Sequence, residues 1–353
     1  MNIDPDVTDS AARSRGDSRI VLGLGTSHSP LLAFDAQTWA SRANDDLKNE
    51  KLNLSDGRYV SYAKLLEERG ARYEAQATIE RFEQQVALAN TALDRLALEL
   101  ERAAPDIAII IGDDHGELFS AANVPGIAVF YGDEIVMHPW KNTWKDPPAW
   151  FDQAMRAYAM DAPHRFPGAP GFARQLIAEL MDRHVDVASV ATVENPQLAG
   201  LGHAFGFVIR RLFGGRPLPV VPILLNTYFE PNNVRPSRCY DLGQILHDSV
   251  KNIPGNLRVA VIGSGGLSHF VTDEELDRRV LDSLCERRGS SLRTLPTQAL
   301  KSGSSEILCW VMAAGALEHL PLAWVEYTPV FRTPAGSGIG LAFAAWRPAP
   351  DFA

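Results

Sequence analysis

The residues best suited to chemistry in this chain are four histidines and one glutamate, each in a short segment rich in small residues. They are His28, His115, His203, His269 and Glu306. Two imidazoles and one carboxylate can hold Fe(II) on one side and leave the opposite side open for substrate and dioxygen. A histidine that does not bind the metal can accept or donate a proton near neutral pH. These residue types therefore indicate a metal site with acid–base groups beside it, although spacing alone does not establish one.

The segments around three of these histidines predict how they are positioned. Apolar runs at residues 20–24, 107–111 and 259–262 precede His28, His115 and His269. Short apolar runs closed by glycine and serine are typical of buried strands. Because ligands bind beyond the carboxyl ends of strands in open α/β sheets, we expect these three histidines to share one edge of a sheet.

Composition limits the class of protein. The 353 residues are 46% hydrophobic and 22% charged, as in folded globular proteins. A net charge of -9 argues against nucleic acid or an anionic membrane as the main partner. Three scattered cysteines favour a reducing compartment. No apolar run reaches the roughly 18 residues of a membrane span, and the first 18 residues contain no apolar signal segment. We therefore expect a cytoplasmic protein.

Residues 62–104 predict a long helix or helix pair. The segment lacks proline, Pro105 ends it, and Gly70 is a point at which it can divide. Apolar residues at helical spacing predict one buried stripe. The stripe comprises Leu88, Ala92, Leu96 and Leu100, with Arg81, Gln85 and Arg95 off it.

Residues 133–171 break the regular pattern. They contain Trp140, Trp144, Trp150 and six prolines without a sustained period. A long irregular segment of this kind is typical of a lid, a binding loop or a subunit contact. A surface elaboration packed by its own tryptophans is the alternative.

Regular alternation of elements fills the rest of the chain. We expect helices at 172–183, 205–213, 240–251, 273–288 and 306–316, and strands at 127–131, 185–193, 218–228 and 258–263. Residues 324–331 and 339–346 resemble a hairpin that closes a sheet. The prediction is a single α/β domain over 19–346, with a mixed central sheet flanked by helices and a long Trp/Pro-rich insertion. Residues 1–18 and 347–353 are expected to be tails.

Several motifs resemble the class III (LigB-type) extradiol ring-cleaving dioxygenases, including the catalytic subunit of protocatechuate 4,5-dioxygenase. The motifs are GTSHSP at 25–30, DH at 114–115, GGLSH at 265–269 and SGSSE at 302–306. The resemblance covers about residues 19–346 in the same order. The opening segment and the single-chain layout are closer to the gallate and 3-O-methylgallate branch. The segments 62–104 and 133–171 are additions relative to the protocatechuate enzyme.

The resemblance implies a role for each candidate residue. His28, His115 and Glu306 match the iron-binding positions, and His269 and His203 match active-site histidines that move protons. Which of these two is base and which is acid stays open. The implied reaction is Fe(II)-dependent insertion of both atoms of O2 into a catechol-type, carboxylated aromatic ring, with ring opening.

Other functions remain consistent with these residues. A relative acting on an aminophenol or a hydroxypyridine, a non-catalytic homologue that binds metal or protein, and a metal-dependent hydrolase are the alternatives. The partners expected are a small aromatic substrate and O2, and a homo-oligomer is expected, with a dimer favoured. The candidate cations for an acidic substrate group are Arg238, Arg332, Lys141 and Lys145.

Overall fold

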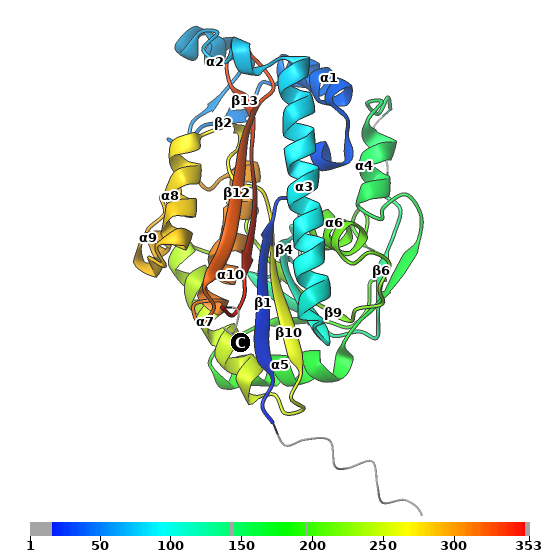
Figure 1. Ribbon diagram of the computed structural model, residues 1–353. Coiled ribbons are helices and arrows are strands. Elements are labelled where there is room, and N and C mark those ends of the chain that lie inside the picture. The colour runs from blue at the N-terminus through cyan, green and yellow to red at the C-terminus, as the bar shows by residue number, and fades with distance from the viewer. Residues whose placement is uncertain (1–15, 142–144, 195, 350–353) are drawn as a thin grey trace, which may run out of the picture.

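A nine-stranded mixed sheet forms the centre of the molecule (Figure 1). The computed structural model describes residues 16–141, 145–194 and 196–349. The strand order is β11-β13-β1-β10-β4-β9-β5-β8, and β12 pairs with β13. The predicted single α/β domain with a mixed central sheet flanked by helices is confirmed, while the description of 133–171 as an insertion stays a prediction. The predicted tails fall largely on residues outside this description, and so does Trp144.

Four neighbouring strands run parallel and set the position of the site. They are β1 (Arg19–Thr26), β10 (Arg258–Ser264), β4 (Ile107–Asp113) and β9 (Val220–Leu225). Helices cover both faces of these strands, so almost every residue in them is buried, as their continuous apolar character predicts. Because the strands are parallel, the segments that follow them emerge at one edge of the sheet.

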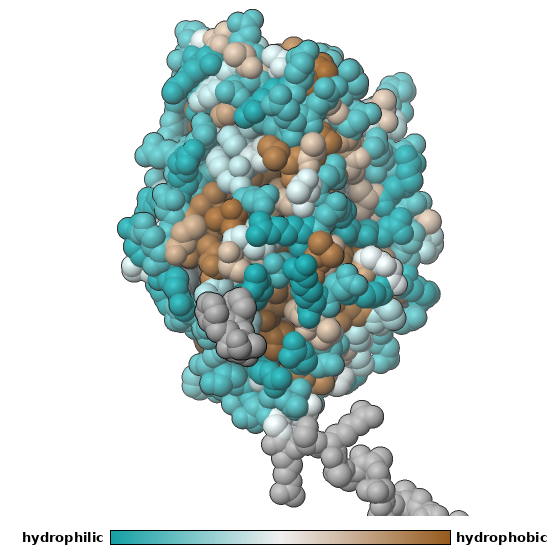
Figure 2. Space-filling model, viewed as in Figure 1, coloured by the Kyte–Doolittle hydropathy of each residue, from teal (hydrophilic) through white to brown (hydrophobic). Residues whose placement is uncertain are grey.

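Antiparallel strands extend the sheet on both sides. On one side, β5 (Ile127–Phe130) pairs antiparallel with β9, and β8 (Ala188–Val190) pairs parallel with β5. On the other side, β13 (Ser337–Trp346) pairs with β1, β12 (Leu322–Phe331) and β11 (His269–Val271). The predicted hairpin is therefore confirmed. Figure 2, viewed as in Figure 1, shows polar residues over most of the visible surface of the molecule, with hydrophobic residues gathered along its middle.

Two helical layers enclose the sheet. One hydrophobic cluster joins the sheet to α1 (Ala36–Asp46), α3 (Ile79–Ala103), α4 (Phe151–Ala157) and α6 (His203–Leu212). The second joins the other face to α5 (Pro170–Asp182), α7 (Pro236–Asn252), α8 (Glu274–Cys285), α9 (Gly289–Arg293) and α10 (Ile307–Ala316). A smaller cluster contains α2 (Tyr62–Arg69) and the pair β2 (Leu52–Asn53) and β3 (Tyr59–Val60). Short 3-10 helices cover Pro30–Ala33 (η1), Glu74–Gln76 (η2) and Ser302–Glu306 (η3).

The segment 62–104 divides at Gly70 as predicted, but its buried stripe differs from the prediction. Gly70 ends α2 with φ +63°, a conformation that favours glycine. In α3 Leu88 is 53% exposed, whereas Gln85 is fully buried and donates a hydrogen bond to the Pro329 carbonyl of β12. The predicted stripe was wrong at these two positions because packing against β12 turns Gln85 inward.

Residues 133–171 contain more regular structure than the sequence predicted. β6 (Glu134–Met137) pairs with β7 (His164–Pro167), and α4 lies between them in the chain. Among the helices that the structure describes, none is both long and apolar enough to cross a membrane.

The corrected stripe of α3 gives a matched test. Leu96→Ala should lower the free energy of unfolding by about 2–5 kcal/mol, because Leu96 is fully buried and its truncation leaves a cavity. Leu88→Ala on the same helix should change it by less than about 0.5 kcal/mol. Urea denaturation followed by circular dichroism measures both. Equal losses would show that the packing of α3 is wrong.

Candidate metal and acid–base site

The carboxylate of Glu306 is the common neighbour of three imidazoles. Glu306 ends η3 just before α10 and is 3% exposed. Its Oε2 lies 3.3 Å from His28 Nε2 and 3.7 Å from His269 Nε2, and its Oε1 lies 3.9 Å from His115 Nε2. Burial raises the pKa of Glu306, but the imidazoles beside it, His28 first, lower the pKa more, so the carboxylate is ionised. The Gly266 amide also donates to Oε2 at 2.6 Å.

His28 follows β1 and has a tautomer that suits a metal ligand. The Ser264 hydroxyl donates to the Ala204 carbonyl at 2.9 Å, so His28 Nδ1 must donate to Ser264 Oγ, also at 2.9 Å. The Nε2 lone pair is therefore free, and this buried atom has no hydrogen-bond partner among the described residues. A lone pair facing a carboxylate 3.3 Å away calls for a cation between them. A divalent metal or a proton would supply it, and the Glu306 charge does raise the pKa of His28 against the effect of burial.

His115 follows β4 and is bound to Asp113. Its Nε2 lies 2.7 Å from Asp113 Oδ2, which also accepts a hydrogen bond from Thr227. The nitrogen of His115 closest to Glu306 is thus already paired. Asp113 Oδ1 is buried without a partner in the part of the chain described, which makes Asp113 a further candidate ligand.

Two groups of residues have potential ligand atoms within 4.8 Å of one another. One is His28, His203 and Glu306, and the other is Asp113, His115 and Glu306. Glu306 belongs to both, so the predicted ligands His28, His115 and Glu306 are brought together but divided between the groups. These donor sets fit a borderline divalent metal such as Fe(II).

Glu117 is a site residue that the sequence analysis missed. Its side chain accepts hydrogen bonds from His203 Nδ1 and from the His115 amide, both at 2.5 Å. Its carbonyl accepts from the amides of Leu198 and Ala199, in the loop before His203. Burial raises the pKa of Glu117, but His203 and His115 lower it more, to about 2. An ionised carboxylate therefore ties the His115 loop to His203.

The signal for Glu117 was present in the sequence. His115 and Glu117 form an H-x-E pair, a local spacing that can place a carboxylate beside an imidazole. The geometry assigns Glu117 to orienting His203, which begins α6, and not to the ligand groups around Glu306.

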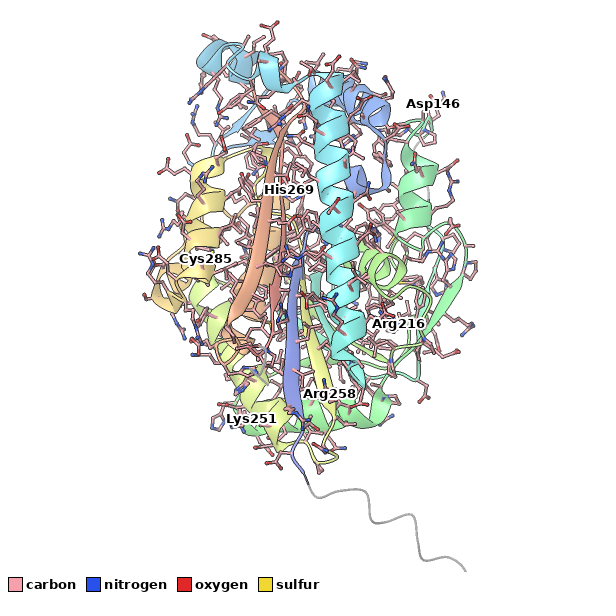
Figure 3. The ribbon with its side chains drawn as sticks, viewed as in Figure 1. Asp146, Arg216, Lys251, Arg258, His269 and Cys285 are labelled. Carbon is pink, nitrogen blue, oxygen red and sulfur yellow. The ribbon has the colours of Figure 1, made fainter. Side chains whose placement is uncertain are left out.

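His269, labelled in Figure 3, begins β11. Its Nδ1 donates to the Leu267 carbonyl at 2.8 Å, which leaves the Nε2 lone pair directed toward Glu306. Burial lowers the pKa of His269 more than Glu306 raises it. Ser304 Oγ accepts from the His269 amide and donates to the His269 carbonyl, so the backbone is fixed too. This arrangement suits a general base.

All five predicted residues line one cavity of ≈ 380 Å³. The 133–171 segment contributes much of the apolar wall, through Trp140, Trp150, Phe151, Ala154, Met155 and Met160. It also contributes Tyr158, whose hydroxyl donates to the His28 carbonyl at 3.1 Å. The segment therefore contacts the site, while its action as a lid and its contact with a second subunit stay predictions. A larger cavity of ≈ 920 Å³ lies at the opposite end of β1 and contains none of the five.

Two arginines line the same cavity. Arg332 is one of the four cations predicted for an acidic substrate group, and the other is Arg42, which the sequence analysis did not single out. Arg238, Lys141 and Lys145 are absent from the wall formed by the described residues.

The parallel strands bring imidazoles to a buried carboxylate, an arrangement that could hold a divalent metal with acid–base groups beside it. Comparison with known proteins gives the family of the chain. Residues 113–342, about two thirds of the chain, match the family described as the catalytic LigB subunit of aromatic ring-opening dioxygenase. The chain belongs to this family, which confirms the prediction from the motifs. The matched range includes His115, His203, His269 and Glu306, and His28 lies before it.

Two curated relatives match shorter segments. The chain is 38% identical over 96 residues to a 2,3-dihydroxyphenylpropionate/2,3-dihydroxicinnamic acid 1,2-dioxygenase from Comamonas testosteroni, covering 27% of each chain. It is 31% identical over 111 residues to a gallate dioxygenase from Pseudomonas putida, covering 29% of this chain and 32% of the relative. The matched segments therefore span less than a third of either relative.

The close packing of Gly266 against His269 gives a test of the site geometry. A Cβ at Gly266 would lie 2.3 Å from His269 Cε1, so Gly266→Ala should displace the ring and cost about 1–3 kcal/mol. Gly171→Ala is the matched control, because a Cβ at Gly171 in α5 meets nothing within 4 Å. Unfolding free energies of both variants decide the point. A Gly266→Ala protein as stable as the control would contradict the described position of His269.

Proposed function

We propose that the protein is an Fe(II)-dependent extradiol dioxygenase that opens a catechol-type, carboxylated aromatic ring. One observation carries the proposal: three imidazole nitrogens lie within 3.9 Å of the Glu306 carboxylate. Family membership supports the reaction class. The free lone pair on His28 supports the metal.

The proposed iron ligands are His28, His115 and Glu306. His28 offers Nε2 and Glu306 offers its carboxylate, while His115 offers Nε2 once the contact with Asp113 is released. Bound Fe(II) would supply open positions for a diol and dioxygen and a route for electron density between them. If His115 keeps its contact with Asp113, a different third ligand is needed beside His28 and Glu306. Either Asp113 or His203 would supply it, because each lies in one of the two groups of potential ligands that contain Glu306.

Two histidines are proposed to handle protons. His269 is neutral and presents a lone pair on Nε2, so it can accept a proton from a diol hydroxyl as the substrate binds. His203 carries its Nδ1 proton toward Glu117, which leaves Nε2 as the atom able to hold or return a proton in the cavity. The assignment of His269 as base rests on its geometry: Nδ1 is bound to the Leu267 carbonyl, and Nε2 is left without a hydrogen-bond donor to it.

The substrate class rests on the cavity and on the relatives. Tryptophan, phenylalanine and methionine side chains suit a flat ring, and two arginines suit an acidic substituent. The relatives are named for gallate and for dihydroxyphenylpropionate, which are both acids. An aminophenol or hydroxypyridine ring and a non-catalytic homologue are the alternatives.

Oxygen uptake tests the proposed activity. Protein reconstituted anaerobically with Fe(II) is mixed with aerated buffer and a panel of catechols, catechol acids, aminophenols and hydroxypyridines. We expect one O2 consumed per catechol acid, with both labelled atoms of ¹⁸O2 in the ring-opened product. Uptake only with an aminophenol or hydroxypyridine would select that alternative. No uptake with any ring would leave the non-catalytic homologue.

Metal content of variants tests the residue roles. His28→Ala and Glu306→Ala should lose stoichiometric Fe(II) and activity together, because each removes a ligand. His269→Ala should keep the metal and lose about 10²–10⁴-fold in turnover, because its role is proton transfer. His164→Ala, at an exposed ion pair with Asp161, is the control and should change neither. Iron is measured by elemental analysis after anaerobic desalting.

A comparison of His115→Ala with Asp113→Asn identifies the third ligand. Loss of iron only in His115→Ala supports His115 as the third ligand. Loss of iron only in Asp113→Asn would show that Asp113, and not His115, is the third ligand. Loss of iron in His269→Ala, with activity restored by added iron, would make His269 a ligand and overturn its proposed role.

A further inference from the structure

We propose that Arg42 of α1 binds the acidic group of the substrate and sets the preference for carboxylated rings. The inference rests on the proposed function, since it concerns the cavity that contains the five site residues. Arg42 lines that cavity together with Arg332 and Trp150.

The cavity wall has three chemically different parts. The imidazoles and Glu306 form the part suited to a metal and a diol. Apolar side chains, among them Trp140, Met155 and Ile339, form a part suited to the face of an aromatic ring. Arg42 and Arg332 are the cations of the wall, so a ring that carries both a diol and a carboxylate matches all three parts.

Arg332 is already matched by a carboxylate of its own. Its Nε and Nη2 donate to the two oxygens of Asp46 at 2.7 and 3.0 Å, and both side chains are 4% exposed. Ser337 adds a third hydrogen bond to Asp46. In a buried bidentate pair of this kind the charge of the arginine is already neutralised, so Arg332 is less suited than an unpaired arginine to bind a second anion.

Arg42 is matched only in part. Its Nη1 donates to Asp45 at 3.0 Å, but the Asp45 side chain is 47% exposed and the same oxygen accepts from Trp150 Nε1. The Nε of Arg42 is buried and has no hydrogen-bond partner among the described residues. Burial lowers the pKa of Arg42, and the nearby charge of Arg332 lowers it further. The charges of Asp46 and Asp45 raise the pKa of Arg42 against these two effects. What remains open for an anion is the part of the guanidinium that Asp45 does not bind, which includes the unpartnered Nε.

The guanidinium is also held in place. Its Cζ lies 4.4 Å from the centre of the Trp150 ring, in a cation–π contact between α1 and the start of α4. A planar guanidinium fixed against an aromatic ring is suited to recognise a planar carboxylate. The ligand class that follows is an aromatic acid with its carboxylate at Arg42 and its diol at the Glu306 end.

The first experiment measures binding without metal or turnover. Tryptophan fluorescence of the metal-free protein is titrated with benzoate and with its uncharged counterpart benzamide. We expect benzoate to bind at least about 10-fold more tightly to the wild type, because hydrogen bonds to charged groups are worth this much. Arg42→Met should abolish the difference, and Arg42→Lys should keep part of it. Arg238→Met, at an exposed arginine outside the cavity, is the control and should behave as the wild type.

The second experiment uses the Fe(II) protein and two substrates, 3,4-dihydroxybenzoate and 3,4-dihydroxybenzamide. Arg42→Met should lower the ratio of their kcat/KM values by about 10- to 100-fold. The change should be in KM for the acid and not in kcat, because Arg42 binds a part of the substrate that does not react. If Arg42→Met does not fold, Arg42→Gln carries the same test.

The outcomes separate the two claims. Equal affinity of the wild type for benzoate and benzamide, or a preference unchanged in Arg42→Met, overturns the inference while leaving oxygen uptake unaffected. No uptake with any catechol overturns the proposed function, and the metal-free titration still decides whether Arg42 binds a carboxylate.

Discussion

Burial of the Glu306 charge is the constraint on which the rest of this site depends. An ionised carboxylate taken out of water is costly unless charges or hydrogen bonds compensate it. Here an amide of the Gly-Gly loop donates to it, and three imidazoles approach it from the ends of β1, β4 and β11. The parallel order of β1, β10 and β4 makes this possible, because it opens three loops at one edge of the sheet.

A second set of contacts fixes which nitrogen of each imidazole faces Glu306 or the cavity. Ser264 holds Nδ1 of His28, the Leu267 carbonyl holds Nδ1 of His269, and Glu117 holds Nδ1 of His203. In each case Nε2 is the nitrogen left for ligation or proton transfer. The exception is His115, whose Nε2 is paired with Asp113, so metal binding and the position of Asp113 are expected to be coupled.

The sequence predicted those parts of the fold that local pattern determines. Continuous apolar runs followed by glycine and serine located β1, β4 and β10, and therefore His28 and His115 at their ends. Long-range partners determine the remainder. Gln85 is buried because of a carbonyl 244 residues away, and Glu117 meets His203 across 86 residues. Trp150 reaches Asp45 across 105 residues, so no local pattern pointed to Arg42.

Metal-edge anomalous diffraction from crystals loaded anaerobically with Fe(II) tests the central claim most directly. The account predicts one iron per chain, bonded at about 2.0–2.3 Å to His28 Nε2 and to the Glu306 carboxylate, with His269 close by but not bonded. Iron bound away from Glu306, or Glu306 still surrounded by imidazoles with no iron in the cavity after loading, would contradict it.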